Sequence, residues 1–242
     1  MTYKLPENLQ SLHFAEEVLR TKALVLLAAD AHLQQHIDAV EASMDLADVL
    51  RQFDTLDEDL KVIQLLGMRT FNAFGSALKL ALSGYSQKSA MIMRDVLETA
   101  FLLDLFRGDR SEIQNWRLTE NKLRKRKYSP IAVRMKLDAR YGDVSKRRAE
   151  HYELLSELAG HASMQADLML RPTPVSDAVI GPFIEAGVLQ AVISELGRLA
   201  IMIGEDLDAF MPDTWERAHP SRLRYANLKA EWLREFYGVR AS

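Results

Sequence analysis

The stretch from residue 58 to residue 82, EDLKVIQLLGMRTFNAFGSALKLAL, decides the fold class of this chain. Its apolar residues recur at spacings of three and four, which is typical of a helix with a wide buried face. After Lys61 the only charged residues are Arg69 and Lys79, and Gly84 follows as a helix stop. We therefore expect a central, mostly buried helix over this stretch.

The remaining segments show the same helical spacing, and no stretch alternates apolar and polar residues as a strand does. The sequence Thr55-Leu-Asp-Glu58 matches a capping box and predicts Thr55 as the N-cap of the central helix. We predict an all-α fold, a single-domain bundle of six to eight helices over residues 1–242, with a loop or linker at 171–182. The other expected helices cover about 6–40 (one helix or two abutting ones), 85–106, 111–127, 129–140, 145–158, 183–210 and 221–237.

The composition excludes several classes of protein. The 242 residues include only 11 Gly and 7 Pro, too few for the regular turns of a β-sandwich or barrel. Cysteine is absent, which excludes a disulfide scaffold, a thiolate zinc site and a cysteine nucleophile. No secretory signal and no apolar run of about 20 residues is visible, so we expect a cytoplasmic protein without a membrane span.

Positive charge is concentrated in one segment. The chain has a net charge of −3, yet residues 117–148 hold 12 basic and 3 acidic residues, a net charge of +9. Such asymmetry indicates a surface for phosphates or an acidic partner, or else a solvated basic face. Trp116, Tyr128 and Tyr141 are interleaved with the basic residues, and aromatic rings can stack on unpaired bases. The candidate anion-binding or nucleic-acid-binding residues are Lys122, Arg124, Lys125, Arg126, Lys127, Arg147 and Arg148.

Two polar motifs stand on otherwise apolar helices. Arg94 and Glu98 are four residues apart, so they share one helix face, either as an ion pair near the surface or as an anion site inside the bundle. The later segment YELLSELAGHAS (152–163) contains Tyr152, Ser156 and His161. His161 follows a predicted helix end, where the helix dipole favours its charged form, and it is also a candidate general acid or base.

The two motifs together resemble a group of uncharacterised, mostly bacterial, all-helical proteins with an R-x-x-L-E motif and a later Y-x-x-L-S segment that ends in His. The resemblance covers about residues 85–165. That group is more distantly similar to HEPN-like helical bundles, many of which are RNA-cleaving toxins or defence proteins. The HEPN marker is R-x4-6-H, whereas here Arg147 and Arg148 precede His151 by four and three residues, and no Arg lies four to seven residues before His161.

His32 and His36 are spaced i, i+4, which offers two imidazoles to one metal, but they make only half a site. An exposed polar helix face is the favoured interpretation, and we expect no metal. The sequence contains no phosphate loop, no dinucleotide motif and no G-x-S-x-G elbow, so we expect no cofactor.

Three functional hypotheses follow. The first is a non-enzymatic module that binds RNA or an acidic protein through residues 117–148. The second, which the resemblance implies, is an RNA-cleaving toxin or defence effector with His161, Arg94 and Glu98 as catalytic residues. The third is a pocket for a small anionic ligand at Arg94. A homodimer formed through the apolar segment 183–210 is a further expectation.

Overall fold

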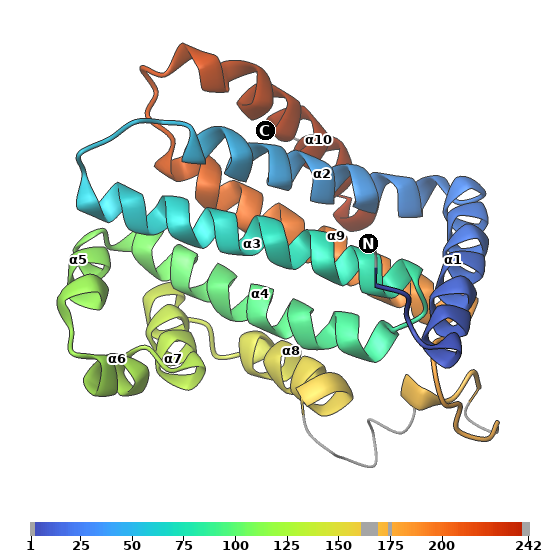
Figure 1. Ribbon diagram of the computed structural model, residues 1–242. Helices are drawn as coiled ribbons and strands as arrows, with labels where there is room; N and C mark the ends of the chain where they lie inside the picture. Colours follow the sequence, from blue (N-terminus) through green and yellow to red (C-terminus); the bar gives the residue numbers. More distant parts are fainter. Residues whose placement is uncertain (1–2, 161–168, 174–175, 239–242) are drawn as a thin grey trace.

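The computed structural model describes residues 3–160, 169–173 and 176–238. Within them the chain forms ten α-helices and no strand, which confirms the predicted all-α class with a slightly higher helix count (Figure 1). The helices are α1 (Glu7–Ala28), α2 (Ala31–Arg51), α3 (Glu58–Leu82), α4 (Ser86–Gly108), α5 (Ser111–Leu118), α6 (Asn121–Lys127), α7 (Pro130–Tyr141), α8 (Arg147–Leu155), α9 (Ala186–Phe210) and α10 (His219–Tyr237).

Four long helices, α2, α3, α4 and α9, form the core. Helix α9 packs against the other three, and its side chains meet theirs in one continuous apolar cluster. Leu46, Ile63, Leu97 and Ile193 supply one fully buried side chain from each of the four helices. Removing this much apolar surface from water is the main driving force for the fold.

Helix α9 is the most central helix, which agrees with its apolar composition. Its length and composition would also permit a membrane span, with a mean hydropathy of 1.5 over 18 residues. Thirteen of its residues are buried by the surrounding helices. About half of the predicted dimerisation segment 183–210 is thus buried within the chain, and dimerisation through it stays a prediction.

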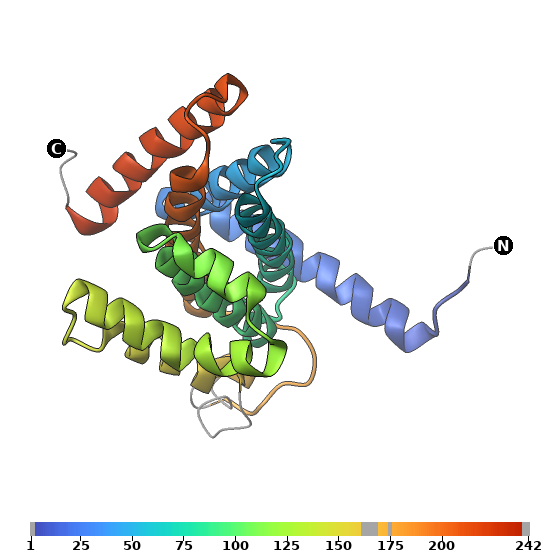
Figure 2. The same ribbon diagram turned by 90° about the vertical axis from the view of Figure 1, so that its left-hand side faces the viewer.

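The shorter helices cover the two sides of the core. Helix α10 packs on α2, whereas α7 and α8 pack on α4. Figure 2 shows α10 in red and the α7–α8 pair in yellow-green on opposite sides of the central helices. This arrangement places Glu98, at the end of the motif on α4, beside Tyr152, at the start of the motif on α8.

Two helix breaks raise the count to ten among the described residues. For 6–40 the sequence allowed one helix or two abutting ones. Two are present, because the Asp30 side chain accepts from the backbone N–H groups of His32 (2.9 Å) and Leu33 (3.2 Å) and starts α2, which continues to Arg51. Glu120 caps α6 in the same way and divides the predicted helix over 111–127. Such caps satisfy backbone donors that a helix leaves open at its start.

Several predicted helix starts were wrong by a few residues. Asp57, not Thr55, is the N-cap of α3, and the Thr55 hydroxyl instead accepts from the Asp57 N–H at 3.0 Å. Helix α9 begins at Ala186 rather than 183, because Glu185 supplies the cap. Helix α10 begins at His219 rather than 221. The predicted stop at Gly84 is confirmed, with a φ of 87° that glycine adopts without steric cost.

Candidate functional site

The structure brings the two polar motifs into contact. Arg94 and Glu98 lie on one face of α4, with Arg94 Nε 3.5 Å from Glu98 Oε1 and both side chains 30% exposed. The hydroxyl of Tyr152, on α8, donates to the same Glu98 oxygen at 3.0 Å. The pair therefore lies at the edge of the bundle, and Tyr152 connects it to the second motif.

Arg134 completes this cluster, and sequence reasoning missed it as a site residue. Its guanidinium carbon lies 4.4 Å from the centre of the Tyr152 ring, while that of Arg94 lies 5.8 Å away. Arg134 is only 7% exposed, and it donates to the Ala149 carbonyl at 3.5 Å. A signal was present, because Val133, Arg134 and Leu137 follow helical spacing along the buried side of α7.

Burial and charge also affect the Tyr152 hydroxyl. Desolvation raises the pKa of Tyr152 above its usual value, and the neighbouring Glu98 carboxylate raises it further. The hydroxyl is therefore protonated at neutral pH and acts as a donor. We call Arg94, Glu98, Arg134 and Tyr152 together the tyrosine cluster.

A short π-helix, Ser156–Gly160, follows α8 where the sequence predicted a continuous helix through 158. The Ser156 hydroxyl donates to the Tyr152 carbonyl at 2.8 Å, inside this irregular turn. Turns of this kind occur often at functional sites. His161, the next residue, lies outside the described residues, so its distance from Arg94 is not defined by the structure.

The other histidine near the HEPN-like motif is engaged within the fold. His151 contacts the Glu195 carboxylate on α9, and Glu195 also pairs with Arg198 at 2.8 Å. Arg148 pairs with Asp138 at 2.9 Å on the neighbouring helix. His151 and Arg148 thus tie α8 to α9 and α7.

The basic segment 117–148 divides into cations with and without partners. Seven of its twelve basic side chains contact acidic groups, carbonyl oxygens or aromatic rings of the same chain. These seven are Arg117, Arg124, Lys127, Arg134, Lys136, Arg140 and Arg148. Among the described residues, Lys122, Lys125, Arg126, Lys146 and Arg147 make no ion pair and are exposed.

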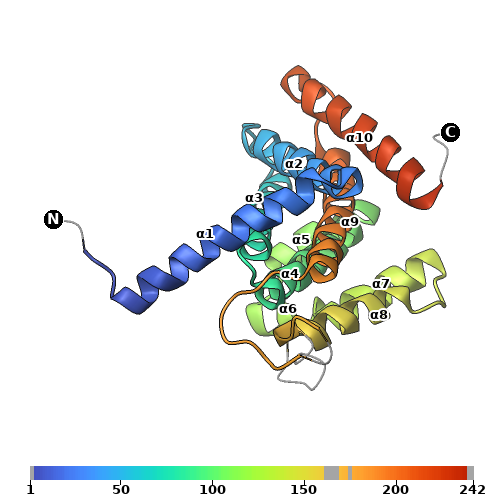
Figure 3. The ribbon, with the colours of Figure 1, turned by 90° about the vertical axis from the view of Figure 1, so that its right-hand side faces the viewer.

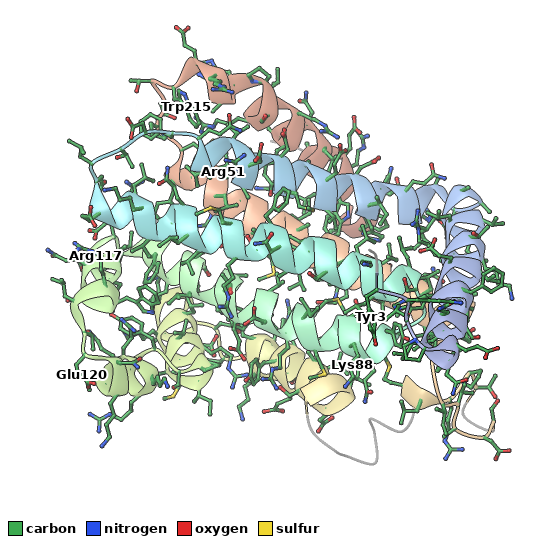
Figure 4. All side chains as sticks on the ribbon, viewed as in Figure 1. Tyr3, Arg51, Lys88, Arg117, Glu120 and Trp215 are labelled. Carbon is green, nitrogen blue, oxygen red and sulfur yellow. The ribbon has the colours of Figure 1, made fainter. Side chains whose placement is uncertain are left out.

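Three of the unpaired cations share α6. Lys122, Lys125 and Arg126 are spaced i, i+3 and i+4, so they lie on one face of this helix. Figure 4 shows Arg117 and Glu120 at the same corner of the molecule, beside α6. Lys146 and Arg147 lie beyond the far end of α7, about 18 Å of helix away. The α6 face is therefore a separate basic surface.

The aromatic rings interleaved with the basic residues each have a cation of the chain against them. Arg124 lies 5.1 Å from the centre of the Trp116 ring, and Lys136 lies 4.9 Å from that of Tyr128. Arg148 lies 5.1 Å from the centre of the Tyr141 ring. Tyr141 is 50% exposed but lies at the far end of α7, so the α6 face itself offers mainly charge.

A groove of about 240 Å³ lies between the tyrosine cluster and α5. Its walls are mainly apolar, and its polar groups are Glu98, Thr99 and the Arg69–Asp95 ion pair. The two carboxylates each have an arginine partner. The groove therefore adds little charge of its own to the basic surface.

The expectation of an exposed polar face for His32 and His36 was wrong for His36, which is 5% exposed. The Trp232 indole N–H donates to His36 Nδ1 at 3.0 Å, and Phe236 stacks on the imidazole at 4.3 Å. Burial, and to a smaller extent the charge of Arg198, lowers the pKa of His36 to about 4. No group of three metal-ligating side chains occurs among the described residues.

A buried carboxyl on α9 was also missed. Asp206 is 3% exposed and lies 3.0 Å from Arg107 Nε, while Arg107 also pairs with Glu205 at 2.9 Å. Burial raises the pKa of Asp206 well above its usual value, and the negative charges of Asp104 and Glu205 add to this effect against the attraction of Arg107. Its ionisation therefore opposes folding as the pH rises above the usual Asp value.

No known family model matches this chain, and neither a curated protein nor a solved structure is similar to it. The resemblance to HEPN-like bundles is therefore still a prediction.

Proposed function

We propose that the protein is a non-enzymatic module that binds the phosphate backbone of RNA through the α6 face. The observation that carries the proposal is the group Lys122, Lys125 and Arg126, three exposed cations on one helix face without an ion-pair partner in the described chain. Like charges at this spacing destabilise a helix. A phosphate backbone would remove that repulsion.

The proposed recognition is electrostatic. Trp116, Tyr128 and Tyr141 already contact cations of the chain, so binding would depend on charge and little on base identity. Three phosphate contacts to a single strand give a slope of log affinity against log salt of about −2. We also propose that binding takes place in the cytoplasm, where RNA is abundant.

The test is fluorescence anisotropy with a labelled 20-nucleotide single-stranded RNA of mixed sequence, from 50 to 200 mM KCl. We expect the triple variant Lys122→Ala, Lys125→Ala and Arg126→Ala to bind at least about tenfold more weakly at 50 mM and to reduce the salt slope by about 2. A charge-matched control removes three cations outside the segment, Lys4, Lys79 and Lys88, and should bind like the wild type.

Three results would contradict the proposal. The first is no binding at 50 mM KCl, and the second is equal weakening of binding in the control variant. The third is shortening of the RNA during the titration. Cleavage that His161→Ala and Arg94→Ala abolish would support the HEPN-like alternative instead.

A second candidate function is a site for a small anion at the tyrosine cluster. The observation that favours it is Arg134, which is buried but has no carboxylate within ion-pair distance among the described residues. A buried cation without a counter-ion is costly, so a bound phosphate or carboxylate would stabilise the fold.

Thermal unfolding with and without 20 mM inorganic phosphate tests this second candidate. We expect phosphate to raise the Tm of the wild type and to have a smaller effect on Arg134→Gln. Arg198→Gln, which removes a half-exposed cation of α9, serves as the control and should respond like the wild type. Equal shifts in all three proteins would show that phosphate acts generally and would exclude the site.

A further inference from the structure

Helix α1 carries two apolar stripes on opposite faces. The inner stripe packs on the rest of the chain and includes Ala23 and Leu27, which are buried. Phe14, Val18 and Val25 lie about 140–180° around the helix from Ala23, at 100° per residue. They are 73%, 41% and 65% exposed, so the outer stripe has no partner within the described chain.

The position of α1 leaves the outer stripe accessible. The helix contacts α2 and α3, and the Tyr85 hydroxyl donates to Glu16, on its inner face, at 2.8 Å. Figure 3 shows α1 extending away from the bundle, with its N-terminal end free of the other helices. The inner face is thus anchored, and the opposite face points to solvent.

The spacing of the outer stripe is that of a coiled coil. Phe14, Val18, Thr21, Val25 and Ala28 follow one another at steps of four, three, four and three residues. This is the a and d pattern of a heptad repeat, with the two valines at a positions. In parallel coiled coils, β-branched residues at a combined with Leu at d favour two strands, and here the d positions hold Phe14, Thr21 and Ala28.

We infer that α1 pairs in parallel with α1 of a second copy of this chain through the outer stripe. In the heptad frame Glu17 occupies a g position and Lys22 an e position. In a parallel pair, g lies opposite the e position five residues further on, so Glu17 faces Lys22 of the partner subunit. An antiparallel pair would instead place g positions opposite g positions, so Glu17 would not face Lys22 of the partner subunit.

The two charged residues are available for this contact. Lys22 is exposed and makes no ion pair among the described residues. Glu17 pairs with Arg20 at 3.5 Å, an exposed contact of little strength. The seam from Phe14 to Ala28 is about 21 Å long, two heptads, so we expect a weak, concentration-dependent dimer. Because α1 is already helical in each copy of the chain, pairing does not require the helix to fold.

The first test is sedimentation equilibrium from 1 to 200 µM. We expect the wild type to dimerise and Val18→Lys with Val25→Lys to raise the dimer Kd at least about tenfold. The control places the same charges on two exposed apolar positions elsewhere, Leu65→Lys and Met135→Lys, and should dimerise like the wild type. Far-UV circular dichroism verifies that all variants are folded.

The second test decides the orientation. Because the chain contains no cysteine, Val18→Cys introduces a single thiol. In the parallel pair it faces Cys at the same position of the second copy, and mild oxidation should cross-link the dimer. Glu17→Lys should weaken the dimer, and addition of Lys22→Glu should restore it.

Three outcomes would overturn the inference. A monomer at every concentration excludes self-association, and a dimer insensitive to the α1 variants places the interface elsewhere. A dimer that depends on Val18 and Val25, but fails to cross-link through Val18→Cys and is not restored by the charge swap, excludes the parallel arrangement. None of these outcomes depends on RNA binding, so this inference and the proposed function are tested separately.

Discussion

His36 is kept neutral by its surroundings, and this has a measurable effect on stability. The unfolded chain binds a proton on His36 below its usual pKa of 6.5, whereas the folded chain binds it only below about 4. A lowered histidine pKa contributes stability at neutral pH that is lost as the pH falls between these two values. The loss across this window is about 3 kcal/mol.

Urea unfolding of the wild type and of His36→Phe between pH 7 and pH 4 checks this prediction. The difference in unfolding free energy between the two proteins should change across this window, because only the wild type gains the proton on unfolding. His32→Ala is the control, since His32 is exposed and pairs with Glu235 at 3.0 Å. Parallel pH profiles for wild type and His36→Phe would contradict the lowered pKa.

At the scale of helices, Gly197 sets the distance between α2 and α9. A Cβ atom at this position would lie 2.5 Å from His36 Nδ1 and 2.7 Å from His36 Cβ, closer than real contacts allow. We expect Gly197→Ala to lower the free energy of unfolding by about 1–3 kcal/mol, because the two helices must separate or the ring must move.

Gly75→Ala is the matched control for this prediction. It also lies inside a helix, but the nearest atom to its new Cβ would be Met44 Cε at 3.8 Å, an ordinary contact. We expect no loss, or a gain of about 0.5–1 kcal/mol from the higher helix propensity of alanine. Equal effects of the two variants in thermal unfolding would show that the approach of α2 to α9 does not depend on Gly197.

Helical spacing in the sequence predicted most of the helices but not their starts. The positions of α3 and α4 were predicted to within a few residues, because long apolar stripes and Gly84 define them. The N-caps were harder, since Thr55, Asp57 and Glu58 are all able to accept from backbone N–H groups. Only the path of the chain decides that Asp57 does so.

At the scale of the whole molecule, sequence alone could not separate the cations that bind their own chain from those that face outward. The distinction depends on partners far along the chain, such as Asp59 for Arg117 and Glu112 for Lys136. The tyrosine cluster was predicted in part, because each motif was visible in its own segment. Its fourth member, Arg134, required knowledge of which helix packs on α8.

The contact between His36 and Gly197 joins residues 161 positions apart (197 − 36). A ribosome adds about 5–20 residues per second, so α2 is complete roughly 10–30 s before α9 exists. During that time the apolar sides of α2, α3 and α4 that later meet α9 have no partner in the chain. We therefore expect the nascent protein to be a target for chaperones and translation pauses before residue 186 to prolong its exposure to aggregation.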